Sequence, residues 1–201
     1  MAELAGYVGA FYITSDAGTA VTSEALTGTI NGTNTAFTFT YENVDYNDLS
    51  VWSTGSDYYL NKDYVLNPQG RIVFAIAPNN ADMIADYSYY PNMIQAGGFL
   101  SWSVDTANEM LETTNFDTNG WKTFSSGLKT WTGSAERHWL NDMIGSNAGR
   151  EVIVRFYTNE AGSDYYTGWG IVNGIGEATS VDALVDDSLS FQGTHNLSKS
   201  V

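Results

Sequence analysis

The residues best suited to catalysis in this 201-residue chain are two histidines, His138 and His195, among 23 carboxylates. A histidine beside an aromatic residue, as His138 is beside Trp139, is far more often a packing or surface residue than a general base. The sequence contains no Gly-x-Ser-x-Gly motif, so a hydrolase of that type would lack its nucleophile site. Carboxylates are too numerous for any pair to stand out as acid and base. We therefore expect no enzymatic activity.

Two further patterns could bind a cofactor or a metal ion. Gly168-Trp169-Gly170, followed by Gly174, superficially resembles a nucleotide-binding loop, but it lies within a strand pattern with no helix or lysine after it. Turns or bulges explain it better. Calcium could bind at two acidic segments, Asp117 to Gly120 and the group Asp182, Asp186 and Asp187. The distal glutamate of a complete calcium loop is absent, so turns are again preferred, and we expect no cofactor and no metal.

Charge and composition narrow the remaining function classes. The chain has 8 basic and 23 acidic residues, a formal net charge of −15 and no cysteine. A surface that binds DNA or RNA needs clustered lysine and arginine, and thiolate metal sites and disulfides need cysteine. At 43% hydrophobic and 14% aromatic residues, the chain is too apolar for a disordered acidic tail. Its start lacks a secretory signal and no stretch is long enough for a membrane span, so we expect a soluble cytosolic product.

The elements expected to position these residues are mainly strands joined by tight turns. Residues 35–41 alternate, which places Phe37, Phe39 and Tyr41 on one face. Asn67-Pro68-Gln69-Gly70 predicts a turn between strands at 58–66 and 71–76. With the Asn31-Gly32 turn and a last strand at 83–90, these form a compact module over residues 26–91. The module resembles a small β module that recurs in bacteriophage tail and fibre proteins.

The second half predicts further strands and one short helix. The strands fall at 99–105, 110–116, 151–157, 165–175 and 187–193. For the helix, Ser134 is the predicted N-cap, Glu136 lies in its first turn, and Gly145 or Gly149 ends it. Its apolar face comprises Trp139, Leu140, Met143 and Ile144. The predicted fold is therefore all-β, a β-sandwich or barrel core with one short α-helix and an inserted small β module.

The order of parts in the second half resembles the tail-tube (major tail) protein family of long-tailed bacteriophages. The segments that carry the resemblance are Ser101 to Val104, Glu112 to Phe116, Gly120 to Lys122, Ser126 to Lys129, Trp131 to Ser134, Val152 to Tyr157, Tyr166 to Gly168 and Asp186 to Gly193. The resemblance implies a structural virion protein whose hexameric rings stack into the tail tube, the conduit for DNA ejection. It also implies assembly in the host cytoplasm with the tape measure, tail tip and tail terminator proteins, and passage of DNA without specific binding.

The resemblance also suggests roles for particular segments. Residues 1–25 and 92–201 would form the tail-tube core, with 26–91 inserted, and an exterior position of the insertion is one interpretation. The turn-rich segment over 115–128 would form an arm that contacts the neighbouring ring. The alternative is a mobile hairpin without that role. Its candidate stacking residues are Asn119, Gly120, Trp121, Lys122 and Gly127. The candidate acidic residues of the lumen are Glu112, Asp186 and Asp187, which could equally belong to a solvated acidic surface.

A carbohydrate-binding module or adhesin of a phage tail is the alternative from another class. The 13 tyrosines and 6 tryptophans would suit stacking on sugars. Tyr58-Tyr59 and Tyr89-Tyr90 are the obvious candidate platforms. Adjacent strand residues point to opposite faces, however, so neither pair can form one flat surface. Packing in a core or an interface is the better explanation of these tyrosines.

Overall fold

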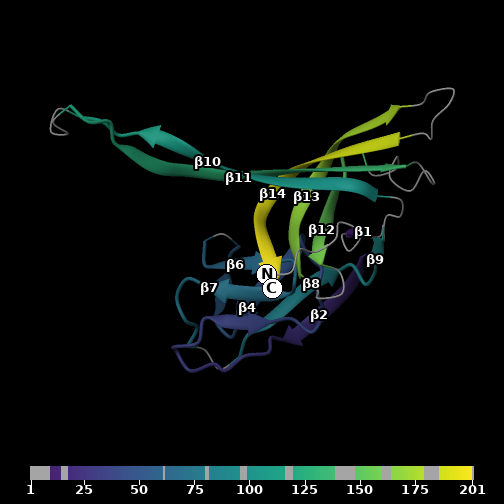
Figure 1. Ribbon diagram of the computed structural model, residues 1–201. Helices are drawn as coiled ribbons and strands as arrows, with labels where there is room; N and C mark the ends of the chain where they lie inside the picture. Colours follow the sequence, from purple (N-terminus) through teal and green to yellow (C-terminus); the bar gives the residue numbers. More distant parts are fainter. Residues whose placement is uncertain are drawn as a thin grey trace. The chain divides into compact units, whose positions relative to one another are not determined.

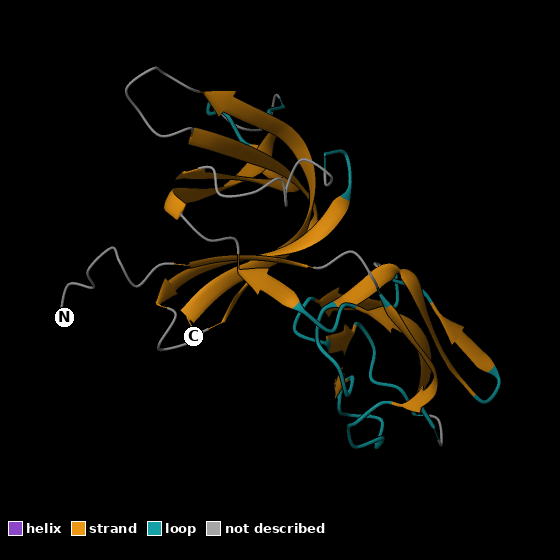
Figure 2. Ribbon diagram, turned by 90° about the vertical axis from the view of Figure 1, so that its right-hand side faces the viewer, coloured by secondary structure: helices purple, strands orange, loops and turns teal. Residues whose placement is uncertain are grey.

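The computed structural model describes residues 10–14, 18–60, 62–79, 82–95, 99–115, 120–138, 148–159, 164–178 and 186–200. All regular secondary structure within these ranges is β-strand, as Figures 1 and 2 show. The all-β prediction is therefore confirmed for the described part of the chain. No helix suited to crossing a membrane occurs in that part.

The largest sheet has seven strands in the order β10-β11-β14-β13-β12-β1-β9. Their bounds are β10 Phe99–Glu112, β11 Phe124–His138, β14 Asp186–Ser200, β13 Asp164–Ala178, β12 Glu151–Asn159, β1 Ala10–Thr14 and β9 Met93–Gln95. Strands far apart in the sequence are neighbours in it, since β1 pairs antiparallel with both β12 and β9. The strands predicted at 151–157, 165–175 and 187–193 are present and longer than predicted. The prediction of separate strands at 99–105 and 110–116 is wrong, because a single strand, β10, runs through both and ends at Glu112.

Two smaller sheets contain the strands between residues 19 and 89. The four-stranded sheet has the order β2-β8-β4-β5, with β2 Thr19–Ala25, β8 Ile84–Tyr89, β4 Val44–Ser53 and β5 Ser56–Tyr58. The three-stranded sheet has the order β3-β7-β6, with β3 Ala36–Thr38, β7 Arg71–Phe74 and β6 Tyr64–Asn67. The paired strands of these two sheets are antiparallel, as expected of short strands joined by tight turns.

The chain divides into two compact units. The first comprises Met1–Ala96, Val152–Trp169 and Leu197–Val201, and the second comprises Gly97–Glu151 and Gly170–Asn196. The first unit contains all the strands of residues 26–91, but whether that stretch is an insertion into a tail-tube core stays a prediction.

The core of the first unit follows the alternation read from the sequence. Phe37 and Phe39 are buried, and each makes an edge-on aromatic contact, with Phe74 and Tyr87 respectively. Tyr41, predicted on the same face, is 42% exposed, and its ring stacks in parallel on the ring of Tyr89. The reason is that β3 ends at Thr38, so the strict alternation stops before position 41.

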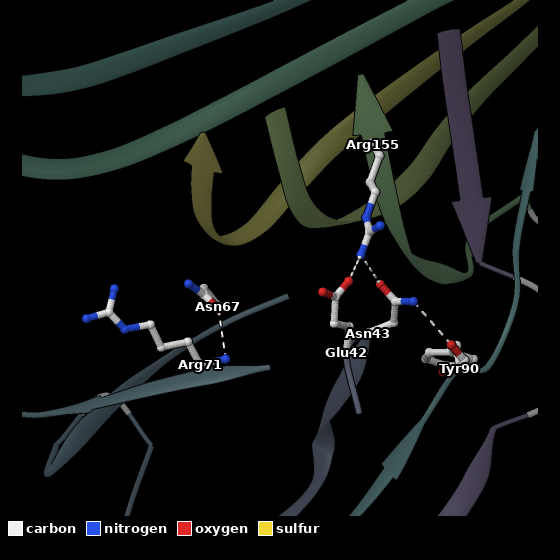
Figure 3. Close-up of polar contacts among 6 residues, drawn as sticks. All are labelled: Glu42, Asn43, Asn67, Arg71, Tyr90 and Arg155. Carbon is white, nitrogen blue, oxygen red and sulfur yellow. Dashed lines mark hydrogen bonds and ion pairs between the residues drawn. The ribbon is translucent and has the colours of Figure 1, made fainter. Parts of the chain in front are cut away.

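The predicted turn at residues 67–70 is present, and both its backbone conformation and a close backbone contact require glycine at position 70. Gly70 has a φ of +73°, and its backbone N–H donates to the Asn67 carbonyl oxygen at 3.1 Å. A Cβ at this position would lie 2.5 Å from the carbonyl oxygen of Tyr41. The Asn67 side chain completes the turn by accepting a hydrogen bond from the Arg71 N–H at 3.0 Å, as Figure 3 shows. Local turn chemistry therefore fixes the β6–β7 hairpin.

Arg155 of β12 ties that strand to the turn before β4. Its guanidinium donates to Glu42 Oε2 at 2.7 Å and to Asn43 Oδ1 at 2.8 Å (Figure 3). Asn43, with a φ of +58°, in turn donates through its side chain to the Tyr90 carbonyl oxygen at 3.2 Å. The guanidinium also lies 5.0 Å from the centre of the Tyr165 ring. A largely buried cation is therefore held by several partners, which is how buried charge is tolerated.

The predicted helix start at Ser134 is wrong. Residues 124–138 form β11, which pairs with β10 on one side and β14 on the other. Ser134 lies opposite Ser103 and Ser190 in this ladder. The sequence here also alternates, with Trp131, Gly133 and Ala135 buried and the residues between them exposed, and that pattern outweighs the cap signal. The rest of the predicted helix lies outside the described residues.

Candidate assembly surface

The second unit is built around a long antiparallel hairpin formed by β10 and β11 (Figure 1). Partners in this ladder run from Ser101 opposite Glu136 to Glu112 opposite Phe124, with one irregularity after Asn108. The pairing of β11 with β14 extends the register across a third strand. Because directly paired residues share a face, the register assigns every side chain of the three strands to one face or the other.

Toward the base of the hairpin, one face of these strands is polar. It carries three residues of each strand, namely Ser101, Ser103 and Asp105 of β10, Thr132, Ser134 and Glu136 of β11, and Ser188, Ser190 and Gln192 of β14. We call this set the polar face. Hydrogen bonds run across it, including Ser101 Oγ to Glu136 Oε2 at 3.1 Å and Ser103 Oγ with Ser134 Oγ at 2.9 Å. The surface is therefore hydroxyl-rich, with carboxylates as its only charged groups.

Three acidic side chains follow the alternation of the polar face. Asp105 and Glu136 belong to the set, and Glu109 is the next acidic residue in the same alternation along β10. All three are exposed. Lys129 is assigned to the opposite face, because it pairs with Asn108. A phosphate that approaches this face therefore meets like charge.

The opposite face changes character along the hairpin. At the base, Trp131, Gly133 and Ala135 are buried, as are Leu189 and Phe191 of β14. Beyond Trp131 the hairpin comprises residues 105–115 and 120–130, which we call the distal hairpin. All its described residues except Gly127 are exposed.

The distal hairpin exposes more large apolar side chains than its length would lead one to expect. They are Met110, Leu111, Trp121, Phe124 and Leu128. Met110 is 60% exposed and Phe124 is 52% exposed, and the register places these two on the same face as neighbours on adjacent strands. A two-stranded hairpin with both faces in water is marginally stable at best. This segment therefore has the composition of a contact surface rather than of a free loop.

The base of the hairpin is anchored by Trp131. The indole is 3% exposed and lies on Gly193 of β14, where a Cβ would come within 2.2 Å of Nε1. Its N–H donates to the carbonyl oxygen of His195 at 2.8 Å. Burial lowers the pKa of the His195 side chain, which favours the neutral imidazole. The main chain of His195 thus helps to hold the indole at the base of the hairpin.

β10 is also the terminal strand of the seven-stranded sheet. Among the residues that the structure describes, no strand lies on its outer side. A fourteen-residue edge strand is a template for pairing with another chain unless something covers it. The same strand therefore offers a main-chain edge and, at its distal end, apolar side chains.

The structure describes some of the sequence-predicted residues and leaves others out. Glu112 Oε2 forms an ion pair with Lys122 Nζ at 3.1 Å across the distal hairpin. Trp121 is highly exposed beside it, and Gly120 has a φ of +83°. Asn119 and the side chains of Asp186 and Asp187 lie outside the described residues. The roles predicted for all these residues in stacking or in the lumen stay predictions.

Gly127 allows the irregularity in the hairpin. Two β11 residues, Gly127 and Leu128, face the single residue Glu109 between the pairs Asn108–Lys129 and Met110–Ser126. A Cβ at Gly127 would lie 3.1 Å from the Cβ of Glu109. The bulge therefore needs a small residue at this position. Bulges of this kind bend a hairpin and re-aim the side chains beyond it.

Sequence reasoning missed Asp105, Glu109 and Glu136 as acidic residues of one surface. The signal that could have found them is the period-two pattern on both sides of the hairpin, with Leu100, Trp102 and Val104 between the polar residues of β10. Glu136 was instead assigned to the first turn of a helix. Within the described residues, no group of three or more histidine, aspartate or glutamate side chains could hold a metal ion. The two acidic segments that were weighed as calcium sites, and for which turns were preferred, lie largely outside that part.

Comparison with known proteins gives a limited result. No protein-family model matches the chain, and no curated protein matches it. Among solved structures, the chain is similar to a chain in the tail of an empty GTA particle with C6 symmetry, with 15% identity, a TM-score of 0.47 and coverage of 54% of this chain and 87% of that one. A chain in the virion of a native gene transfer agent particle gives 13% identity, a TM-score of 0.46 and coverage of 54% and 89%.

Proposed function

We propose that this chain is a structural virion protein whose hexameric rings stack into the tail tube of a long-tailed phage, the conduit for DNA ejection. The observation that carries the proposal is the distal hairpin, which exposes apolar side chains and continues a long edge strand. Both features are liabilities in an isolated subunit and are removed when copies join in a closed ring. The resemblance of the ordered segments of the second half to the tail-tube family supports the same role.

The proposed partners follow from that role. The chain would assemble with copies of itself and with the tape measure, tail tip and tail terminator proteins in the host cytoplasm, and would reside in the virion tail. It would act without catalysis, cofactor or metal. DNA would pass the polar face, whose carboxylates repel phosphate and avoid the salt-sensitive attraction that lysine or arginine would create.

Negative-stain microscopy of the purified full-length protein tests the assembly. Rings or tubes support the proposal, whereas dispersed monomers at every concentration contradict it. The double variant Met110→Ser/Phe124→Ser should abolish rings while leaving the circular dichroism spectrum unchanged, because both side chains are already exposed in the subunit. Ile76→Ser is the matched control, since Ile76 is 84% exposed but lies outside the distal hairpin. Equal polymerisation of the double variant would contradict the assigned contact.

Cosedimentation of short duplex DNA with assembled tubes tests the acidic wall. Wild-type tubes should retain little DNA, and Asp105→Lys or Glu136→Lys should increase retention in a way that salt reverses. Asp57→Lys, an equal charge reversal on β5 of the first unit, is the control and should change retention less. Glu112→Lys reports separately on the residue predicted from sequence. If all reversals act equally, overall charge rather than the polar face controls DNA retention.

A further inference from the structure

A groove of about 380 Å³ runs beside the β4–β5 hairpin of the first unit and has no role in the proposed assembly. Aromatic and polar side chains line it together, including Trp52 and Ser50 of β4, Asp57 of β5 and Tyr59 just after β5. Grooves of this size with a few converging polar groups are typical of small-ligand sites.

The strand register places Trp52 and Asp57 on one side of this hairpin. Val51 pairs with Tyr58, and Trp52 pairs with Asp57. Alternation therefore places Trp52 and Asp57 on the face opposite Tyr58, whose ring packs edge-on against Phe74 at 5.2 Å.

Tyr59 follows β5 directly and reaches the groove from just beyond the end of the strand. It is 56% exposed and lines the groove together with Trp52. Two aromatic side chains, Trp52 before the β4–β5 turn and Tyr59 after it, therefore line the same groove.

Hydrogen bonds hold both ends of this segment in place. In the β4–β5 turn, Asp82 accepts from the Thr54 N–H and hydroxyl, each at 3.0 Å. After β5, the Tyr59 N–H donates to Asp63 Oδ2 at 2.9 Å, and the Asp63 N–H donates back to the Tyr59 carbonyl oxygen at 2.8 Å. The aromatic pair is thus set by the backbone before any ligand arrives, which reduces the entropy lost on binding.

The groups in the groove select for an uncharged ligand with many hydroxyls. Aromatic rings stack on the apolar faces of sugar rings, while Asp57 accepts hydrogen bonds and Ser50 donates or accepts them. An anionic sugar would be repelled by Asp57 and by the net charge of −15. Lys62 Nζ lies 5.1 Å from the centre of the Tyr59 ring but does not line the groove, so it adds no anion site there.

We propose that this groove binds a neutral glycan, with Trp52 and Tyr59 stacking on its sugar rings and Asp57 and Ser50 binding its hydroxyl groups. The site lies wholly within the first unit, whereas the distal hairpin that carries the proposed assembly contact belongs to the second.

The test uses the soluble full-length protein with maltotriose, chitotriose and a wider array of neutral oligosaccharides, and with trigalacturonate as the anionic counterpart. Binding is measured by saturation-transfer NMR and by tryptophan fluorescence titration. At least one neutral glycan should bind, and more tightly than trigalacturonate. Binding of no neutral glycan, or a preference for the anionic probe, would overturn the proposal.

Variants assign the binding to the groove. Tyr59→Ala should weaken binding by about 2- to 12-fold through lost stacking, whereas Tyr59→Phe should retain it because the ring remains. Asp57→Asn should also weaken binding. Trp121→Ala is the matched control, since it removes an exposed aromatic residue of the other unit. Binding that survives Tyr59→Ala unchanged places the glycan elsewhere and refutes the site.

Discussion

Replacing Gly193 of β14 with alanine should loosen the base of the β10–β11 hairpin, because Trp131 lies directly on that glycine. A Cβ at position 193 would lie 2.2 Å from Trp131 Nε1 and 2.3 Å from Cε2. These distances are far inside ordinary van der Waals contact, so the indole must move by roughly 1 Å. Trp131 is the last buried residue before the distal hairpin, and its displacement would propagate to the proposed contact surface.

The expected cost follows from the contacts of Trp131. Forcing extra volume into a packed site costs about 1–3 kcal/mol. The moved indole also gives up its 2.8 Å hydrogen bond to the His195 carbonyl oxygen, and a buried donor without an acceptor costs about 1–3 kcal/mol. Alanine recovers about 0.5–1 kcal/mol over glycine in a strand. The free energy of unfolding should therefore fall by about 1–5.5 kcal/mol, which lowers Tm by roughly 2–20 °C.

Urea denaturation followed by circular dichroism and tryptophan fluorescence measures this change. Gly18→Ala is the control, because the nearest atom to its added Cβ is 3.7 Å away. In a Trp131→Phe background, where the indole Nε1 is absent, the alanine penalty should shrink by at least about 1 kcal/mol. A loss below about 0.5 kcal/mol for Gly193→Ala, or an equal penalty in both backgrounds, would refute the reasoning. The variant should also form fewer or shorter tubes.

Three further predictions concern the first unit. Gly70→Ala should cost about 2–4 kcal/mol in urea denaturation, because its φ is +73° and a backbone carbonyl oxygen blocks the new Cβ. Burial raises the pKa of Tyr64 to about 12. The neutral tyrosine therefore favours the folded state below pH 10. This stabilisation, about 2–3 kcal/mol, is lost as the pH rises from 10 to 12. Tyr64→Phe should flatten that alkaline decline in Tm, and Tyr59→Phe at an exposed ring should not. Arg155→Ala should lower the free energy of unfolding by about 2–4 kcal/mol, because the arginine is the buried partner of its ion pair with Glu42. Glu42→Gln changes the exposed partner and should lower it by less than about 1 kcal/mol.

Local sequence patterns predicted most of the strands. The alternation of Phe37 and Phe39 and the Asn67–Gly70 turn depend only on neighbouring residues, and both are present in the structure. Turn residues constrain φ directly, and alternation reports the burial of one face, so neither needs knowledge of the partner strand.

The error at Ser134 shows where local reasoning fails. A serine followed by Glu136 and a run of apolar residues matches a helix start as well as it matches a strand. The choice is made by β10 and β14, which flank this segment on both sides and satisfy its backbone groups. No window of sequence around Ser134 contains that information.

The candidate site was harder to predict than the fold for the same reason. Asp105 and Glu136 are more than thirty positions apart in the sequence, and the register alone puts them on one face. Glu112 looked equivalent to them as an acidic residue of the same strand, but its pairing with Phe124 assigns it to the opposite face and its carboxylate meets Lys122. A surface shared by three strands becomes visible only when their pairing is known.

The division of the hairpin into two faces resolves a difficulty in the proposed function. A chain with 23 acidic and 8 basic residues should repel its own copies. Burying carboxylates in an assembly contact would add a large desolvation free energy that opposes association. On the distal hairpin, Met110 and Phe124 lie on the face opposite the one assigned to Asp105. An apolar contact on this face would therefore leave Asp105, Glu109 and Glu136 in water, while Glu112, which shares the face with Phe124, is paired with Lys122. In the proposed tube, β10 would therefore supply an apolar contact between subunits on one face and a surface that repels phosphate on the other.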